Sequence, residues 1–129
     1  MKRPDFTRRA YPVLDVLEVH DGDTYRLLLD RGGEDAWFPW LRLKDFSCPE
    51  LSEPGGAEAR DAADLLLDAA VPTMWVVTYR AARPFTVRRF QSERSSLGRY
   101  LADVWLADDR RLGDELVARG LARPGARVG

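Results

Sequence analysis

A single helical segment among short strand-like segments constrains the fold more than any other feature of this sequence. Within residues 57–70 (AEARDAADLLLDAA), small and apolar side chains recur at helical spacing, and carboxylates lie opposite them. The side chains expected on the buried face are Ala59, Ala63, Leu66 and Ala70. Segments rich in branched and aromatic residues, typical of strands, lie at 11–19, 24–29 and 37–43 before the helix, and at 73–79 and 100–106 after it. A second, short helix is predicted at 111–119, with Gly120 as its C-terminal cap.

Three strands, a helix, two or more strands and a final helix form the element order of a five-stranded OB-fold barrel. We therefore predict an α+β, mainly β fold, with one helix between strands three and four and a short C-terminal helix. Other small α+β barrels share this order and stay open as alternatives. The length of 129 residues fits one domain. We place this domain at 11–123, with an N-terminal extension at 1–10 and a short tail at 124–129.

Cysteine, histidine and charge narrow the classes of function. Cys48 is the only cysteine and His20 the only histidine, so an internal disulfide and a structural zinc site are excluded. Any metal would have to be held by oxygen atoms. The formal charge of −1 excludes a basic field over the whole molecule. A local basic stretch is present, because six arginines but only one acidic residue, Glu93, fall within residues 80–99; arginine-rich codon usage is the alternative explanation. These arginines are Arg80, Arg83, Arg88, Arg89, Arg94 and Arg99.

The sequence also lacks the apolar segments that direct a chain to a membrane. No run of 18 apolar residues is present, and no apolar stretch follows the basic residues Lys2 and Arg3. We therefore expect neither a transmembrane segment nor a secretory signal, and predict an intracellular protein.

Four short fragments carry the functional signal. They are Asp21-Gly22-Asp23-Thr24; Arg42-Leu43 followed by Pro49-Glu50; Gly56-Ala57-Glu58-Ala59; and Gly98-Arg99 with Leu116-Val117 and Gly120-Leu121-Ala122. Each fragment is weak alone, since a DGDT sequence occurs in many loops. Together, in this order and with Arg42 seven residues before the Pro-Glu pair, they resemble the staphylococcal nuclease (thermonuclease) family. The resemblance runs from about residue 13 to residue 122.

This resemblance implies an OB barrel that hydrolyses DNA, RNA or both with one bound metal ion, Ca²⁺ in the family, with Mg²⁺ or Mn²⁺ as alternatives. It implies that the metal is held by Asp23 with the nearby Asp21 and the backbone carbonyl of Cys48. It further implies that Glu50 positions the attacking water and that Arg42 and Arg99 hold the scissile phosphate.

Elementary chemistry agrees with these roles but does not require them. Hard cations such as Ca²⁺ prefer oxygen ligands, and guanidinium groups stabilise the negative charge that develops on phosphoryl oxygens. A carboxylate near a metal can orient a water molecule or accept its proton. Each residue also has a structural alternative: Asp21 and Asp23 as a hairpin turn, Glu50 as a cap, and Arg42 and Arg99 as cross-strand ion pairs.

Three departures from the family pattern keep a second hypothesis open. Ser47 stands where the family has its second metal-binding aspartate, so an uncharged and poorer metal ligand replaces a carboxylate. Asp45, two residues earlier, would share the face of Ser47 in an extended strand and partly compensate by acting on the metal through a bridging water molecule; the alternative is that Asp45 pairs with Lys44, Arg42 or another arginine. The residues before Gly98-Arg99 are Ser95-Ser96-Leu97 in place of an acidic, a basic and a tyrosine residue. The family's terminal helix has no counterpart before Gly129.

The first hypothesis is therefore a metal-dependent endonuclease with an altered site. The second is a weak or inactive nuclease-like OB module that binds nucleic acid, or a protein within a larger assembly. His20 is expected at the solvent-facing end of a strand. Most of the four strand tryptophans are expected in the core, although OB barrels also stack bases on such side chains. They are Trp37, Trp40, Trp75 and Trp105.

Overall fold

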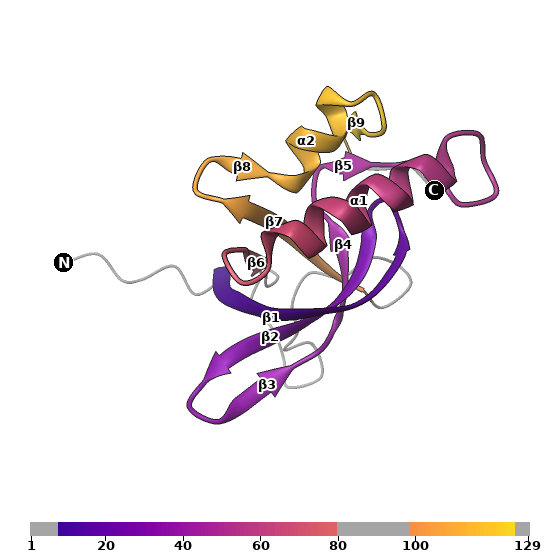
Figure 1. The fold of residues 1–129 in the computed structure, drawn as a ribbon. Coiled ribbons are helices and arrows are strands. Elements are labelled where there is room, and N and C mark those ends of the chain that lie inside the picture. The colour runs from indigo at the N-terminus through magenta and orange to yellow at the C-terminus, as the bar shows by residue number, and fades with distance from the viewer. Residues whose placement is uncertain (1–7, 80–98, 126–129) are drawn as a thin grey trace, which may run out of the picture.

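The computed structural model describes residues 8–79 and 99–125, and in these residues five strands close into a barrel (Figure 1). Around the ring, each strand is hydrogen-bonded to the next, and all pairs are antiparallel except the parallel pair β4–β7. In ring order the strands are β1 (Arg8–Asp21), β2 (Thr24–Gly32), β4 (Trp40–Leu43), β7 (Tyr100–Ala107) and β6 (Trp75–Tyr79). The predicted OB-like α+β barrel is therefore confirmed.

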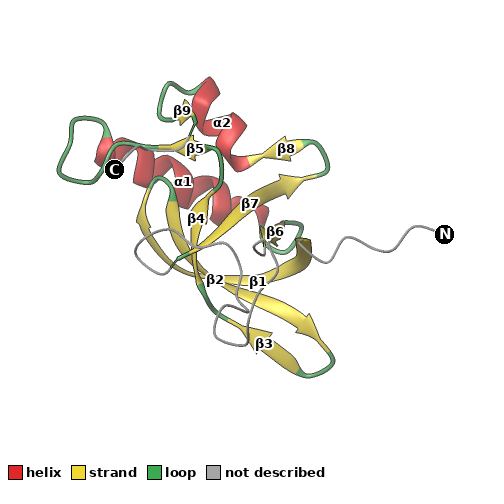
Figure 2. Ribbon diagram, turned by 180° about the vertical axis from the view of Figure 1, so that it is seen from behind, coloured by secondary structure: helices red, strands yellow, loops and turns green. Residues whose placement is uncertain are grey.

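Two helices lie at one end of this barrel. Helix α1 (Gly56–Ala70) follows β4 in the chain and precedes β6, as predicted, and α2 (Leu112–Ala118) follows β7. Both views show the helices at the end of the molecule opposite the β2–β3 hairpin (Figures 1 and 2). Gly120 ends α2 with a φ of 71°, the left-handed conformation expected of a C-terminal cap.

Short strands complete the fold and correct two predicted boundaries. The predicted third strand, 37–43, is divided into β3 (Asp35–Trp37) and β4, because Pro39 has no backbone N–H for a ladder. The barrel also extends beyond the predicted domain limits, since residues 8–10 of β1 pair with β6. The remaining strands are β5 (Phe46–Ser47), which pairs with β9 (Arg123–Pro124), and β8 (Arg110–Arg111), which pairs with β7.

The core lies between the inner face of the barrel and helix α1. Strand β2 alternates from Tyr25 to Asp30, with Tyr25, Leu27 and Leu29 fully buried. On α1 the buried side chains are Ala59, Ala63, Leu67 and Ala70. The predicted face is correct except that Leu67, not Leu66, is the buried leucine.

A close contact at Gly22 brings three segments together. A Cβ atom at this position would lie 2.7 Å from Cys48 Sγ and 2.8 Å from Ala59 Cβ, closer than real Cβ atoms approach. Glycine thus lets the β1–β2 turn, the loop after β5 and helix α1 pack at one corner of the barrel. This corner contains most of the residues that the sequence motifs single out.

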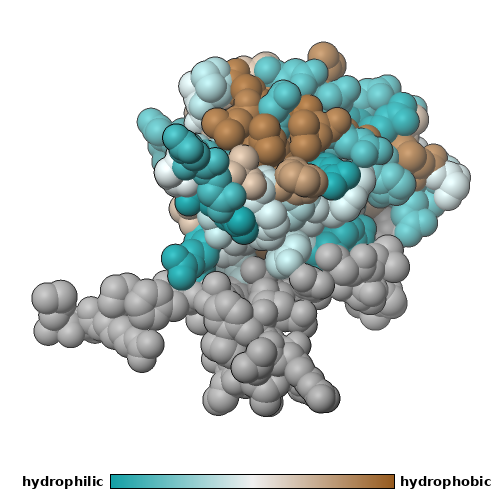
Figure 3. Space-filling view, turned by 90° about the horizontal axis from the view of Figure 1, so that it is seen from below, coloured by the Kyte–Doolittle hydropathy of each residue, from teal (hydrophilic) through white to brown (hydrophobic). Residues whose placement is uncertain are grey.

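Some large apolar side chains stay on the surface. The exposed ones are Leu14, Leu17, Phe38, Leu51 and Leu65. Figure 3 shows that, on the face seen from below, apolar side chains gather in one area with hydrophilic neighbours around them. In residues 8–79 and 99–125, no helix is long and apolar enough to cross a membrane.

Candidate active site

The turn between β1 and β2 holds two buried carboxylates close together. Asp21 is 8% exposed and Asp23 4% exposed. The backbone N–H of Asp23 donates to Asp21 Oδ1 at 3.1 Å, so the first carboxylate closes the turn. The Tyr25 hydroxyl donates to the carbonyl of Gly22 from inside the barrel. The hairpin-turn alternative therefore applies to Asp21, and its role at a metal stays a prediction.

Asp23 joins the turn to two other segments. Its Oδ2 accepts the backbone N–H of Cys48 at 2.9 Å, and its Oδ1 accepts the hydroxyl of Thr24 at 3.1 Å. Its backbone carbonyl accepts the N–H of Leu43, the last residue of β4, at 2.9 Å. Both carboxylate oxygens are therefore already hydrogen-bonded within the protein.

Arg42 is a buried cation at the same corner, directly opposite Thr24 in the β2–β4 ladder. Its NH2 atom lies 3.6 Å from Asp23 Oδ2. Its NH1 atom donates to the carbonyls of Leu43 and Phe46, both at 2.9 Å. The guanidinium thus holds the bend after β4, while NH2 is the atom closest to the carboxylate.

Arg99 reaches the corner from the start of β7. Its NH1 atom donates to Thr24 Oγ1 at 2.9 Å, and Thr24 in turn donates to Asp23. Two arginines that are far apart in the sequence thus converge on one aspartate, one through an ion pair and the other through a threonine hydroxyl.

Glu50 lies at the rim of this corner, with an exposed side chain. Its backbone position is fixed, because its N–H donates to Glu53 Oε1 at 2.8 Å and its carbonyl accepts the Glu53 N–H at 2.9 Å. A Cβ on Gly56 would lie only 1.9 Å from the Glu50 carbonyl oxygen, so the loop packs tightly on the start of α1. Glu50 is two residues from Cys48, which places its Cα within about 7 Å of the Cys48 Cα.

Asp45 is not placed to replace the missing aspartate. The extended strand assumed for residues 45–47 is wrong, because Asp45 adopts a φ of 65° in a turn and only Phe46–Ser47 form a strand. The exposed Asp45 carboxylate lies 3.5 Å from Lys44 Nζ, so Asp45 forms an ion pair with its neighbour in the turn. Ser47 is half-buried in β5, opposite Arg123.

The pKa of the Asp21 carboxyl is raised in this turn. Burial, with the hydrogen bond and the negative charge of Asp23 as further causes, raises the pKa of Asp21 from 3.8 to about 6. Two carboxylates in one buried turn therefore resist being ionised together, and an additional cation would relieve this repulsion.

These donors fit a metal ion only in part. In the part of the chain that the structure describes, no group of three or more His, Cys, Asp or Glu side chains is arranged to hold a metal. An all-protein Ca²⁺ cage of six to eight oxygens is thus not supplied by side chains. One or two carboxylates together with substrate phosphate and water is, however, the usual arrangement for Mg²⁺ in phosphate-processing sites. Asp21 and Asp23 are the two carboxylates that the β1–β2 turn brings together for such an arrangement.

The raised pKa of Asp21 gives a prediction for stability. A carboxyl whose pKa is higher in the folded than in the unfolded protein stabilises the fold below about pH 4, and this contribution is lost as pH rises through 6. An asparagine side chain in its place would resemble the protonated acid at every pH. We expect Asp21→Asn, in EDTA, to raise the free energy of unfolding on the order of 2 kcal/mol at pH 8 and little at pH 4. Urea unfolding at both pH values measures this, and an equal effect at both would contradict it.

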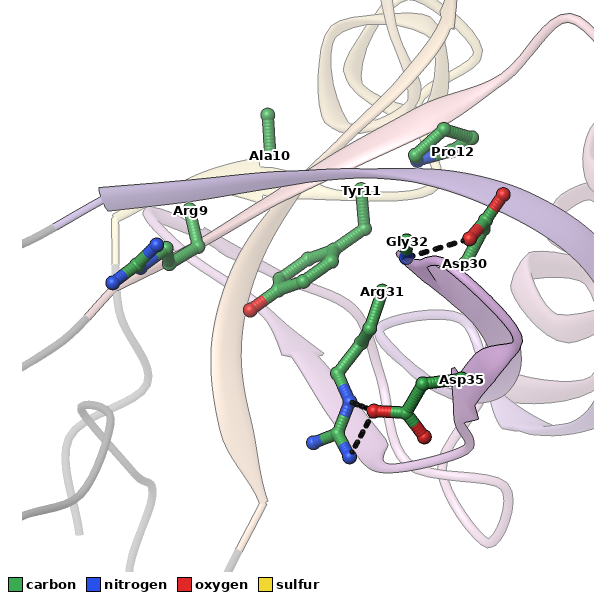
Figure 4. A pocket seen from close by; sticks show the side chains of 8 residues that line it. All are labelled: Arg9, Ala10, Tyr11, Pro12, Asp30, Arg31, Gly32 and Asp35. Carbon is green, nitrogen blue, oxygen red and sulfur yellow. Dashed lines mark hydrogen bonds and ion pairs between the residues drawn. The ribbon is translucent and has the colours of Figure 1, made fainter.

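A separate cavity of about 500 Å³ lies near the far end of the barrel (Figure 4). It is lined by Arg9 and Tyr11 of β1 and by Arg31 and Asp35 around the β2–β3 hairpin. The Arg31 guanidinium is bound to Asp35 at 2.8–2.9 Å, so its charge is balanced locally. At about 3.3 Å per residue along β2, this cavity is roughly 20 Å from Thr24, and it belongs to a different part of the surface.

Several sequence predictions fall outside the corner or outside the described residues. The arginines at 80–94 and the Ser95-Ser96-Leu97 segment lie outside the described residues. His20 is exposed, as expected, and packs edge-on against Trp40.

The expectation that most strand tryptophans are core residues is wrong, because all four are only half-buried. Sequence reasoning also missed Thr24 as the bridge between Arg99 and Asp23, although its place in the DGDT fragment was a signal.

Comparison of the chain with models of known protein families and with curated proteins finds no match.

Proposed function

We propose that this protein is a metal-dependent phosphodiesterase of the staphylococcal nuclease type that hydrolyses nucleic acid. The observation that carries the proposal is the convergence of Asp23, Arg42 and Arg99 in one hydrogen-bonded network. The backbone of Glu50 is held in the loop two residues after Cys48, whose N–H belongs to this network. These residues come from the β1–β2 turn, β4, the start of β7 and the loop before α1. They are also the residues on which the family resemblance rests.

The arginines of this network suit a phosphate group. Arg99 is half-buried, and in a complex its guanidinium could bind phosphate oxygens through the geometry that makes arginine a bidentate phosphate ligand. Arg42 has NH1 committed to two carbonyls, so only its remaining N–H groups are available to a substrate. Both positive charges would stabilise the charge that develops on the phosphoryl oxygens during attack.

Glu50 is the residue proposed to act on water. Its carboxylate projects from a fixed backbone at the exposed rim, where bulk water has access. A carboxylate at this place can accept a proton from the attacking water, and the departing oxygen takes up a proton from solvent. The divalent cation, held by Asp21, Asp23 and the Cys48 carbonyl, would supply charge neutralisation and lower the pKa of bound water when present.

A second candidate function is a non-catalytic module that binds nucleic acid. The observation that favours it is the internal use of the site: both Asp23 oxygens and the NH1 atom of Arg42 already bind the protein's own backbone and Thr24. Such contacts stabilise the corner whether or not catalysis takes place. Ser47, with no charge, also contributes less to a cation than an aspartate would.

A cleavage assay distinguishes the two functions. Single-stranded DNA and RNA are incubated with the protein in EDTA and in Ca²⁺, Mg²⁺ or Mn²⁺. We expect cleavage with at least one cation and none in EDTA, and we expect Asp23→Asn, purified identically, to lose the activity. Asparagine keeps the size of the side chain but not its charge, and a contaminating nuclease would remain active in this preparation. Binding of nucleic acid without cleavage under every condition would favour the second candidate.

A further inference from the structure

A cluster of aromatic and arginine side chains covers the outer face of the barrel next to the candidate site. Its members are His20, Arg26, Phe38 and Trp40, and we call it the Arg26 cluster. The guanidinium of Arg26 lies over the ring of Phe38. Its central carbon is 4.9 Å from the centroid of the Phe38 ring and 5.9 Å from the centroid of the Trp40 ring. His20 meets Trp40 edge-on, with ring centroids 6.4 Å apart and planes at 85°.

The cluster is built and accessible. Arg26 Nε donates to the carbonyl of Phe38 at 3.0 Å, which fixes the guanidinium against the segment between β3 and β4. The side chain of Phe38 is 52% exposed although it is large and apolar. Phe38 is not part of the core, since the inner face of the barrel is filled by other residues such as Leu27 and Leu41.

The ladder between β2 and β4 connects this cluster directly to the candidate site. Thr24 is opposite Arg42, and two residues further along, Arg26 is opposite Trp40. Residues two apart in a strand share a face, so both pairs lie on the outward-facing side of the ladder, about 6–7 Å apart, although the Thr24–Arg42 pair is itself buried. A chain whose phosphate lies at Arg42 and Arg99 would bring an adjacent nucleotide over Trp40.

Charge indicates which part of a nucleotide the cluster would take. Glu18 is opposite Arg26 in the β1–β2 register, so the positive charge of Arg26 has an acidic neighbour. A phosphate is therefore better placed at Arg99 and Arg42, whereas a neutral ring can stack on aromatic side chains or on a guanidinium plane. Bases that are paired in a duplex do not offer their faces, which favours a single strand.

We propose that the Arg26 cluster is a stacking site for an unpaired nucleobase next to the phosphate held at the candidate site. This inference deepens the proposed function, because it names single-stranded nucleic acid as the ligand and a base-binding surface beyond the phosphate contacts. It requires binding only, so it is tested without cleavage.

The test compares two labelled single strands by fluorescence anisotropy, in EDTA so that metal-dependent cleavage does not occur. One is oligodeoxythymidylate and the other is an abasic phosphodiester of the same length and charge. We expect the protein to bind the strand with bases at least about fivefold more tightly, since stacking of one base contributes roughly 1–3 kcal/mol. Phe38→Ala should remove most of this preference while leaving the affinity for the abasic strand unchanged.

Two further variants locate the effect. Trp40→Leu should also reduce the preference for the strand with bases. Because Trp40 is half-buried, the thermal unfolding of this variant is measured as well, to show that it is folded. Leu65→Ala is the matched control, since Leu65 is a large apolar side chain, 73% exposed, on helix α1 away from the cluster. It should bind both strands as the parent does.

Equal affinity of the parent for both strands would overturn the proposal, and so would a preference that survives in folded Phe38→Ala and Trp40→Leu. Neither result depends on catalysis. A base preference in a protein that cleaves nothing would leave the stacking site in place and remove only the nuclease function.

Discussion

Replacing Glu50 by glutamine is expected to lower the rate of nucleic-acid cleavage at least about 100-fold, because general-base assistance by a positioned carboxylate contributes roughly 10²–10⁴-fold. Glutamine has the same shape but does not accept a proton from water at neutral pH. The backbone contacts that hold this position, the N–H to Glu53 and the carbonyl to the Glu53 N–H, do not involve the Glu50 carboxylate. We therefore expect the variant to stay folded, which thermal unfolding checks, with the loss of activity confined to kcat.

The matched control for this variant is Glu53→Gln. Glu53 lies in the same exposed loop, and the oxygen of a glutamine can still accept the Glu50 N–H, so this variant should keep the parent rate within about threefold. Single-turnover cleavage of a single-stranded oligonucleotide measures both. If the two variants were equally impaired, the loop conformation and not the Glu50 carboxylate would be responsible. A parent-like rate for Glu50→Gln would remove Glu50 from the proposed mechanism.

The order of elements was enough to predict the barrel, because the change from strand-like to helical periodicity and back is strong around residues 57–70. The short pairings were not predictable. Strands β5 and β9 contain two residues each and are formed by contacts between distant parts of the chain. The choice of Leu67 over Leu66 on α1 likewise depends on the angle at which the helix lies on the barrel, which adjacent leucines in a sequence do not reveal.

The convergence of the candidate site was predicted from motif spacing, whereas the internal bonding of its side chains was not. Arg42 was expected to be available to a phosphate, yet its NH1 atom binds the carbonyls of Leu43 and Phe46. This contact depends on how the chain turns after β4, including the positive φ at Asp45. A sequence pattern indicates which side chains meet but not which of their atoms remain available.

The tryptophans show a similar limit. An aromatic residue in a strand fits either face of a barrel, and only the register decides which. Trp40 pairs with Arg26 on the outer face, and Trp75 stacks on Trp105, with ring centroids 5.3 Å apart and planes at 7°. A half-buried aromatic side chain leaves part of its ring surface available to a ligand, whereas a fully buried one does not.

The buried network also sets a limit on what substitutions at the site can show. Removing one partner of a buried ion pair leaves the other charge uncompensated and typically costs about 3–5 kcal/mol. Asp23→Ala or Arg42→Ala would therefore combine a loss of stability with any loss of activity. Variants that retain shape and hydrogen-bonding capacity, such as Asp23→Asn, separate the two effects better.

Ser47→Asp is expected to raise the affinity for Ca²⁺ at least about tenfold. Ser47 directly precedes Cys48, whose N–H is bonded to Asp23 Oδ2, so a carboxylate at this position would add a full negative charge close to the turn carboxylates. Ca²⁺ binds more tightly as the number of charged oxygen ligands increases. A tenfold gain needs only about 1.4 kcal/mol, which is modest for one additional carboxylate at a partly buried position.

The same substitution should have opposite effects on stability with and without the ion. In EDTA, a third carboxylate beside Asp21 and Asp23 increases repulsion, so the Tm should fall below that of the parent. With excess Ca²⁺, binding to the folded state restores stability by mass action, so the Tm should rise by more than it does in the parent. Asp45→Asn is the matched control, because the Asp45 carboxylate is paired with Lys44 in a turn and should contribute nothing to the ion. Calorimetric titration and thermal unfolding measure both effects. If a folded Ser47→Asp protein bound Ca²⁺ no better than the parent, the corner would not be a cation site, and its carboxylates would serve only to hold the turn, the Cys48 loop and the two arginines together.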